Sequence, residues 1–249
     1  MSGHSKWSTI KRQKGVNDAK RSAMFTKVAR EIAVAARAGG GDPDANYRLR
    51  LAIDKARSIN MPAENIKRAI EKATGGADEI QYEEIVYEGY GSGGVAVLVE
   101  AATDNRNRTA AEVRSIFAKA GGQLAGSGAV AWQFEARGLI TVGTEGTDPD
   151  EVALAAIDAG AADVDTETDP MEIYTEPSEL FAVRKALEEA GVTVEDAESA
   201  MIAKQTVILD EDHVRKTLRL VDLLEELDDV QRVTTNVDIP EELLAEMAG

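Results

Sequence analysis

The segment Tyr82–Thr103, with the sequence YEEIVYEGYGSGGVAVLVEAAT, predicts a β-hairpin. Tyr82–Tyr87 and Val95–Thr103 have strand-like composition, and the glycine-rich run Gly89–Gly94 separates them. A phosphate-binding loop leads from a strand into a helix and often carries a lysine, whereas this run lies between two strands and has none. We therefore interpret Gly89–Gly94 as a tight turn that needs positive φ angles, or as a glycine surface for a partner's backbone.

Short strands and helices alternate after the hairpin. Helices are expected over 109–120, 149–159, 177–190 and 212–227, and strands over 130–134, 139–142, 163–167, 172–174, 192–195, 200–209 and 230–237, with a flexible loop over 121–128. Two sets of strands and helices can be cut from this order. We predict a discontinuous middle domain, 79–128 plus 200–240, with an acidic domain, 129–199, inserted into it, both antiparallel α+β domains of the ferredoxin-like kind.

Three amphipathic helices are expected before the hairpin. Apolar residues recur at helical spacing over Ala19–Ala38, and glycines end that run. Asp42-Pro43 supplies a cap and a first-turn proline for the second helix, and Pro62 begins the third. Residues 1–78 are thus predicted to form a basic arm and a three-helix bundle, and the whole chain an α+β multidomain protein.

The composition excludes several classes of protein. Cysteine is absent, which excludes a disulfide framework, a thiolate metal site and a cysteine nucleophile. The longest apolar runs fall far short of the roughly 18 residues that span a bilayer. The only histidines, His4 and His213, lack the sequence context of a hydrolytic site. We expect no catalytic residues, no metal site and no cofactor.

The net charge of −17 is divided unevenly along the chain. Residues 1–72 carry a net charge of +9, and residues 73–249 carry −26. A basic module on an acidic body can hold a polyphosphate on one face while the body repels it elsewhere, although a basic face can also serve solubility alone. The candidate nucleic-acid-binding residues of the basic module are His4, Lys6, Trp7, Lys11, Arg12, Lys14, Lys20, Arg21, Lys27 and Arg30. For Trp7, stacking on an unpaired base and covering the core of the bundle are equal alternatives.

A second candidate nucleic-acid site follows the hairpin, where a strand ends and a helix begins. The segment Thr103–Thr109 reads TDNRNRT, and an aspartate or asparagine there can cap the helix. Capping does not require Arg106 and Arg108, whose guanidinium groups suit phosphate, and the amides of Asn105 and Asn107 suit base edges. The alternative for the two arginines is salt bridging to the acidic body.

Acidic residues alternate over 163–172 without the glycine-bearing spacing of a calcium loop. A solvated strand edge explains them better than a cation site. A metal-dependent nuclease that uses these acids is the remote alternative to a binding protein. Nothing in the sequence assembles a nucleophile, a base and an electrophile for it.

Motifs distributed over the whole chain resemble the YebC/PmpR family, which has a mitochondrial relative that activates translation of cytochrome oxidase. The resembling motifs are Gly3–Trp7 with Ile10-Lys11, Arg30–Ile32, Ala35–Arg37, Asn60–Pro62, Tyr87–Gly91, Thr103–Asn105 with Asn107–Thr109, Phe134-Glu135 and Asp228–Gln231. Ser92 and Ala203 stand where the family usually has proline. Because the resemblance begins at Ser2, no transit peptide is expected.

The resemblance implies three domains, a cytoplasmic bacterial protein and neither enzyme activity nor a cofactor. Members of the family are described as DNA-binding transcriptional regulators or as translation factors that relieve ribosome stalling at proline-rich stretches. The sequence has no clear helix-turn-helix with an exposed recognition helix. Ribosomal RNA is therefore the favoured partner, duplex DNA is the alternative, and no membrane is expected.

Overall fold

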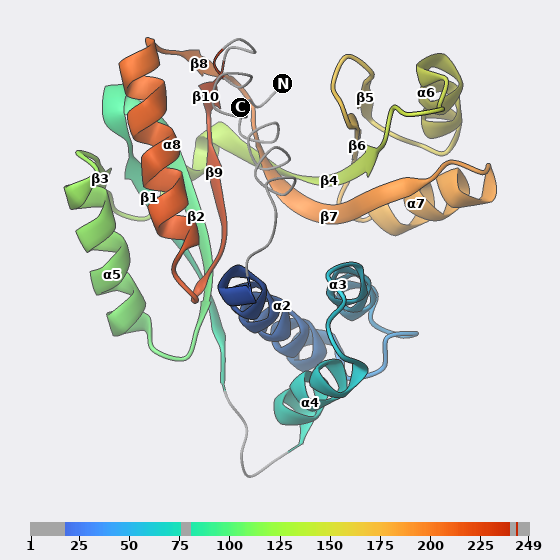
Figure 1. Ribbon diagram of the computed structural model, residues 1–249, viewed down its shortest axis with the longest axis horizontal. Coiled ribbons are helices and arrows are strands. Elements are labelled where there is room, and N and C mark those ends of the chain that lie inside the picture. The colour runs from blue at the N-terminus through green and yellow to red at the C-terminus, as the bar shows by residue number, and fades with distance from the viewer. Residues whose placement is uncertain (1–17, 76–80, 240–242, 244–249) are drawn as a thin grey trace. The chain divides into compact units, whose positions relative to one another are not determined.

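The computed structural model describes residues 18–75, 81–239 and 243 (Figure 1). Helices α2 (Asp18–Gly39), α3 (Tyr47–Ser58) and α4 (Ala63–Thr74) confirm the three helices expected before the hairpin. Their shared core is made of small and aliphatic side chains, with Ile32 and Leu49 fully buried.

The second helix begins four residues later than the Asp42-Pro43 prediction. Asn46 caps it, because its side-chain oxygen accepts from the backbone N–H of Leu49 at 3.1 Å. The Asn46 amide also donates to the carbonyl oxygens of Ala35 and Gly40, at 2.7 and 2.8 Å. Asp42 instead accepts from the N–H of Asp44 within a turn. A buried amide that binds both helices thus outweighs the local proline signal.

The predicted hairpin is confirmed. Strands β1 (Glu83–Tyr90) and β2 (Ala96–Thr103) pair antiparallel, and the short helical turn η1 (Ser92–Gly94) joins them. Gly93 and Gly94 have φ angles of 74° and 82°, so the glycines supply the left-handed backbone that the turn requires. Strands β3 (Gln123–Leu124) and β9 (Val230–Thr235) complete a sheet of order β3-β1-β2-β9.

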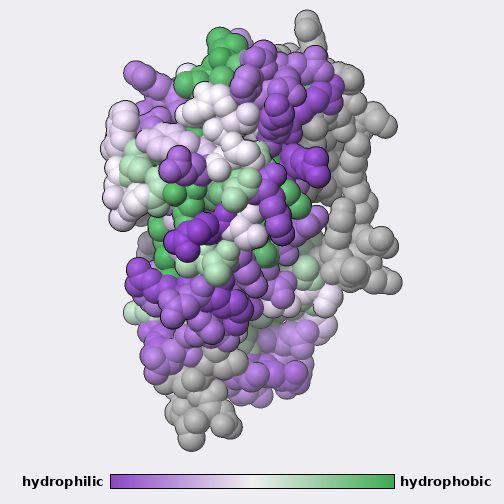
Figure 2. All heavy atoms as spheres, turned by 90° about the vertical axis from the view of Figure 1, so that its left-hand side faces the viewer, coloured by the Kyte–Doolittle hydropathy of each residue, from purple (hydrophilic) through white to green (hydrophobic). Residues whose placement is uncertain are grey.

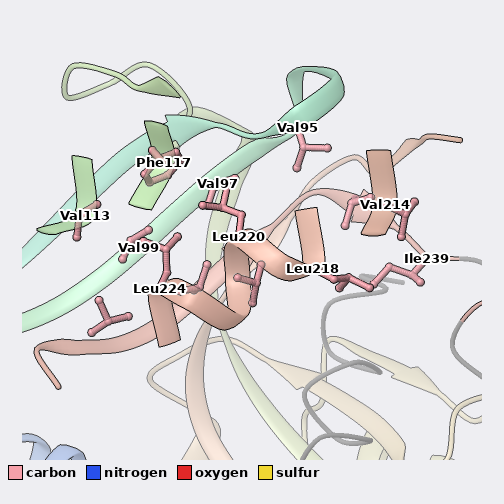
Figure 3. Packing of buried hydrophobic residues seen from close by; sticks show 14 of the residues in the cluster. Val95, Val97, Val99, Val113, Phe117, Val214, Leu218, Leu220, Leu224 and Ile239 are labelled. Carbon is pink, nitrogen blue, oxygen red and sulfur yellow. The ribbon is translucent and has the colours of Figure 1, made fainter. Parts of the chain in front are cut away.

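Helices α5 (Arg106–Lys119) and α8 (Glu211–Glu225) cover one face of this sheet (Figures 1 and 3). The core between them contains Val97 and Val99 of β2, Phe117 of α5 and several α8 leucines. Two short strands, β8 (Val207–Ile208) and β10 (Val237–Asp238), form a separate parallel pair.

Residues Phe134–Ile202 form a compact unit of their own, distinct from the described residues before and after them. The unit runs β4 (Phe134–Val142), α6 (Pro149–Asp158), β5 (Asp163–Asp165), β6 (Met171–Thr175), α7 (Leu180–Glu189) and β7 (Val194–Ala203). Its sheet order, β5-β6-β4-β7, and its β-α-β-β-α-β succession are ferredoxin-like.

The α+β class, with a helical N-terminal part followed by sheet domains, is confirmed. In the middle sheet the hairpin strands β1 and β2 occupy the centre, which distinguishes its strand order from that of the inserted sheet. The division into three domains at 78, 128 and 200 stays a prediction.

Two local predictions are corrected. The strand expected at 130–134 is a 3-10 turn, η2 (Ala131–Gln133), and β4 begins only at Phe134. The strands expected at 192–195 and 200–209 are one strand, β7, followed by the short β8.

We expect a chain that ends at Ile202 to lose the fold of the middle domain, whereas residues 134–202 alone unfold cooperatively. Truncation removes Leu218, Leu220 and Leu224, each at most 1% exposed, and burial of such a side chain contributes about 1.5–3 kcal/mol. Thermal melting followed by circular dichroism, with limited proteolysis, measures both fragments. A protease-resistant middle domain in the truncated chain would contradict the expectation.

Candidate nucleic-acid interface

The start of α5 is fixed by a cap. The side-chain oxygen of Asn105 accepts from the backbone N–H of Arg108 at 3.1 Å, and the first turn contains no acidic residue. The N–H groups of Arg106 and Asn107 precede the first intrahelical bonds, and the helix dipole makes this end positive. The turn therefore has the polarity that suits an anion.

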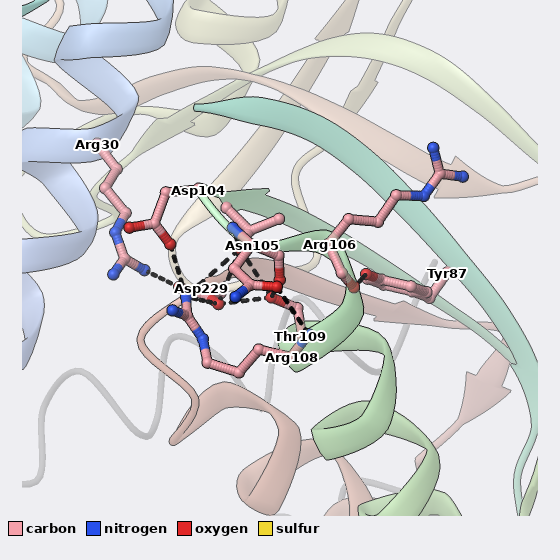
Figure 4. A network of polar contacts seen from close by, with 9 residues as sticks. Arg30, Tyr87, Asp104, Asn105, Arg106, Arg108, Thr109 and Asp229 are labelled. Atoms are coloured by element: carbon pink, nitrogen blue, oxygen red, sulfur yellow. Dashed lines mark hydrogen bonds and ion pairs between the residues drawn. The ribbon is translucent and has the colours of Figure 1, made fainter. Parts of the chain in front are cut away.

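Asp229, in the turn between α8 and β9, lies at the centre of a polar network beside this cap (Figure 4). Its side chain accepts from the hydroxyls of Thr103 and Thr109, at 3.0 and 2.6 Å, and from Arg108 Nη2 at 2.6 Å. Asp229 is 3% exposed. Burial raises the pKa of Asp229, but the bonds from Thr109 and Arg108, with the charge of Arg30, outweigh burial and hold that pKa below its ordinary value.

The opposite carboxylate oxygen of Asp229 faces α2. Arg30 Nη1 lies 2.6 Å from Asp229 Oδ1 without the alignment of a hydrogen bond, so the contact is an ion pair. The Arg30 guanidinium also lies over the ring of Tyr82, 5.5 Å from its centroid. One turn earlier in α2, Lys27 Nζ donates to the carbonyl of Glu225 at the C-terminus of α8. Lys27 and Arg30 of α2 therefore both contact the middle domain.

The two arginines of the α5 start differ in their contacts. Arg108 Nη2 also binds Asp104 at 2.8 Å, so Arg108 forms the salt bridges that the sequence left open as its alternative. These bonds raise the pKa of Arg108 above its ordinary value, those to Asp229 and Asp104 first. Arg106 is 67% exposed and contacts Glu83, itself 58% exposed, at 3.3 Å. A surface pair of this kind contributes little and can exchange for another anion.

The other candidate residues are placed as follows. Asn107 and Arg21 are exposed, and Lys20 lies in the first turn of α2. His4, Lys6, Trp7, Lys11, Arg12 and Lys14 lie outside the described residues.

Figure 2 shows the side on which α5 and α8 lie, where hydrophilic side chains alternate with smaller hydrophobic areas.

Asp229 was not identified as a functional or structural centre from the sequence. A signal was available, because an aspartate directly before a buried strand needs a partner when that strand is covered on both sides. The residues that satisfy it are 120 or more positions away in the chain, Thr109 being the nearest. The spacing of residues near Asp229 in the sequence therefore does not reveal its partners.

Among the described residues, one group has the geometry of a metal site: Asp210, Asp212 and His213. Asp210 caps α8 by accepting from the His213 N–H at 2.9 Å, and it also contacts His213 Nδ1 at 2.7 Å. Asp212 binds Lys216 one turn later. Capping and helix-surface pairing account for all three residues, so the group does not support the nuclease alternative.

Comparison with known proteins identifies the family. Residues 5–76 match the model of the TACO1/YebC protein N-terminal domain, and residues 82–237 match that of the TACO1/YebC second and third domain. The chain belongs to the TACO1/YebC family. The resemblance found in the sequence motifs is thereby confirmed.

Relatives in this family match over nearly the full length. Proteins of Rubrobacter xylanophilus and Chloroflexus aurantiacus, each called a probable transcriptional regulatory protein, are 55% and 56% identical, with 100% and 98% of both chains covered. The crystal structure of a conserved hypothetical protein from Aquifex aeolicus has a TM-score of 0.84 and 48% identity, over 90% of this chain and 92% of that one. In the described ranges, no helix combines the length and hydrophobicity needed to cross a bilayer.

The Asp229 network predicts acid-sensitive stability. Because the folded pKa of Asp229 lies below that of an unfolded aspartate, about 3.9, the network stabilises the fold above that pH and loses this contribution as the pH falls through the folded pKa. We expect Asp229→Asn to lower the free energy of unfolding at pH 7 by about 1.5–3 kcal/mol, the range for hydrogen bonds to a charged group. The free energy of unfolding of the variant should also fall less steeply below pH 4 than that of the unmodified protein. Urea unfolding between pH 3 and pH 7 measures both effects, and parallel pH profiles for the two proteins would contradict this account.

Proposed function

We propose that this protein is a non-enzymatic RNA-binding regulator of gene expression that acts on the ribosome and relieves stalling at proline-rich sequences. In this proposal the basic residues from Lys6 to Arg21 and the start of α5 contact ribosomal RNA. The observation that carries the proposal is the contrast between the two arginines of α5. Arg108, 42% exposed, is bound to the buried carboxylate of Asp229, whereas Arg106, 67% exposed, forms a surface pair with Glu83.

The start of α5 offers three kinds of donor to a phosphate. Arg106 supplies a guanidinium fork, Asn107 an exposed amide, and the helix its first N–H groups. Asn105 is occupied by the helix cap and Arg108 by Asp229, so these two residues hold the start of α5 in place. We assign contact with the RNA phosphate to Arg106 and Asn107. Asn105 and Arg108 have a positioning role.

Charge distribution supports a single orientation on a polyanion. The chain outside residues 1–72 carries a net charge of −26, which repels phosphate from most of the middle and inserted domains. Cations at the chain start and at the α5 start would then select the face that contacts RNA. This arrangement suits a protein inserted among ribosomal RNA segments.

The helical bundle favours RNA over the major groove of DNA. Lys27 and Arg30 of α2 contact the middle domain, so they are not presented to a groove. Helix α4 follows α3 after a short connection, but its exposed surface pairs Lys67 with Glu71, at 3.7 Å. A recognition helix that carries acids on its exposed face is poorly suited to a phosphate-lined groove.

DNA-binding transcriptional regulation is the second candidate function. The names of the Rubrobacter and Chloroflexus relatives favour it. The two candidates differ in the nucleic acid that the protein retains, which can be measured directly with purified ribosomes and with duplex DNA.

We expect Arg106→Ala to reduce co-sedimentation with ribosomes while changing stability by no more than about 0.5 kcal/mol, as for other exposed side chains. Arg108→Ala should lower the melting temperature, because it removes a cation from the buried Asp229. Arg114→Ala, at an exposed site farther along α5, is the matched control and should retain binding. Arg106→Lys should restore binding if phosphate charge alone is recognised, and restore little if the guanidinium fork is needed. Full ribosome binding by Arg106→Ala would remove α5 from the interface.

Deletion of residues 1–17 should weaken RNA binding and reduce its salt dependence. These residues carry Lys6, Lys11, Arg12 and Lys14, and each lost phosphate contact lowers the log–log slope by about 0.7–0.9. The deletion leaves α2 intact. A full-length variant with all four cations changed to glutamine is the control for chain length, and it should reproduce the reduced slope. An unchanged slope in both proteins would show that these cations do not contact RNA.

A further inference from the structure

Trp132 is a large aromatic side chain held outside the core. It lies in the turn η2 and is 68% exposed, although full burial of tryptophan is worth several times the burial of a methyl group. Neither capping nor core packing accounts for an aromatic residue at this position.

The loop that carries Trp132 is fastened to strand β1 through one buried side chain. The carboxylate of Glu88, 5% exposed, accepts from the backbone N–H groups of Gly128, Val130 and Ala131, at 2.6, 2.7 and 2.7 Å. Burial raises the pKa of Glu88, but these three bonds outweigh burial and keep that pKa below its ordinary value. Val130, fully buried, anchors the same loop. The three bonds to Glu88 fix the backbone from Gly128 to Ala131, where the expected flexible loop (121–128) ends and the expected strand (130–134) begins.

The Trp132 indole is oriented by the same loop. Its Nε1 donates to the carbonyl of Ala129 at 3.1 Å, and the hydroxyl of Tyr90 donates to that carbonyl at 3.0 Å. The polar atom of the indole is thus already bonded, which leaves the ring surface for a partner. A rigid aromatic ring loses little conformational entropy on binding.

The neighbours of Trp132 are small and basic. A Cβ added at Gly126 or Gly128 would meet no atom within 4 Å, so the loop before the tryptophan is open on that side. Lys204 Nζ donates to the carbonyl of Trp132 at 3.0 Å. An exposed ring on a residue whose backbone carbonyl binds an ammonium group matches a nucleotide, whose base stacks and whose phosphate is anionic, better than it matches an apolar protein groove.

We propose that Trp132 is a stacking platform for an unpaired base of single-stranded RNA, with Lys204 beside the adjoining phosphate. The proposal rests on the RNA-binding function above and adds a site at the turn η2, separate from α5. Glu88 is a positioning residue, since it acts through the loop.

Tryptophan fluorescence tests this site, because Trp7 and Trp132 are the only tryptophans. In a Trp7→Phe chain, titration with a short oligouridylate at low salt should quench the emission of Trp132. Trp132→Ala should weaken binding by about 5-fold or more, the effect of losing one stacked base, with an unchanged melting temperature. Trp132→Phe should retain most of the affinity, whereas Trp132→Leu, apolar but without a π face, should not. A fully paired RNA duplex should bind without the quenching.

The outcomes separate this site from the proposed function. Saturable oligouridylate binding with unchanged Trp132 emission would overturn the platform and leave RNA binding standing. Absence of binding to oligouridylate and to ribosomes would overturn both. Emission that responds to ribosomal proteins and not to RNA would make Trp132 a protein contact and overturn the platform.

Discussion

A carboxylate buried between two guanidinium groups is the contact on which the described polar architecture depends. Asp229 would be costly to bury alone, and Arg30, Arg108 and two threonine hydroxyls satisfy it. The four partners come from three parts of the chain, so one side chain joins α2, the end of β2 and the start of α5 to the turn before β9. Removal of any partner leaves part of a buried charge unsatisfied, which makes the network cooperative.

This network also determines which cations remain available to a ligand. Arg108 and Arg30 are drawn toward Asp229, and Lys27 is drawn to the C-terminal carbonyl of α8. Arg106 remains at the surface beside a helix N-terminus. The sequence presents all four as equivalent basic residues, whereas the fold binds three of them to Asp229 or to the end of α8 and leaves Arg106 at the surface.

Local signals predicted the hairpin and the three helices, because alternation, helical spacing and glycine turns are short-range properties. Long-range contacts caused the errors. Asn46 replaced Asp42-Pro43 as a cap because its amide also binds α2, and Glu88 converted the expected strand at 130–134 into a 3-10 turn. The role of Arg108 likewise depends on Asp229, which is distant in sequence. The positions of such partners follow from the tertiary structure and not from spacing.

We propose that the exposed cations of this acidic protein bind ribosomal RNA. Ultraviolet crosslinking in growing cells, followed by sequencing of the nucleic acid attached to the purified protein, tests it most directly. The account predicts that ribosomal RNA makes up most of the recovered sequence and that reads cluster at a few positions. Recovery of intergenic DNA in place of ribosomal RNA would contradict the account and support transcriptional regulation.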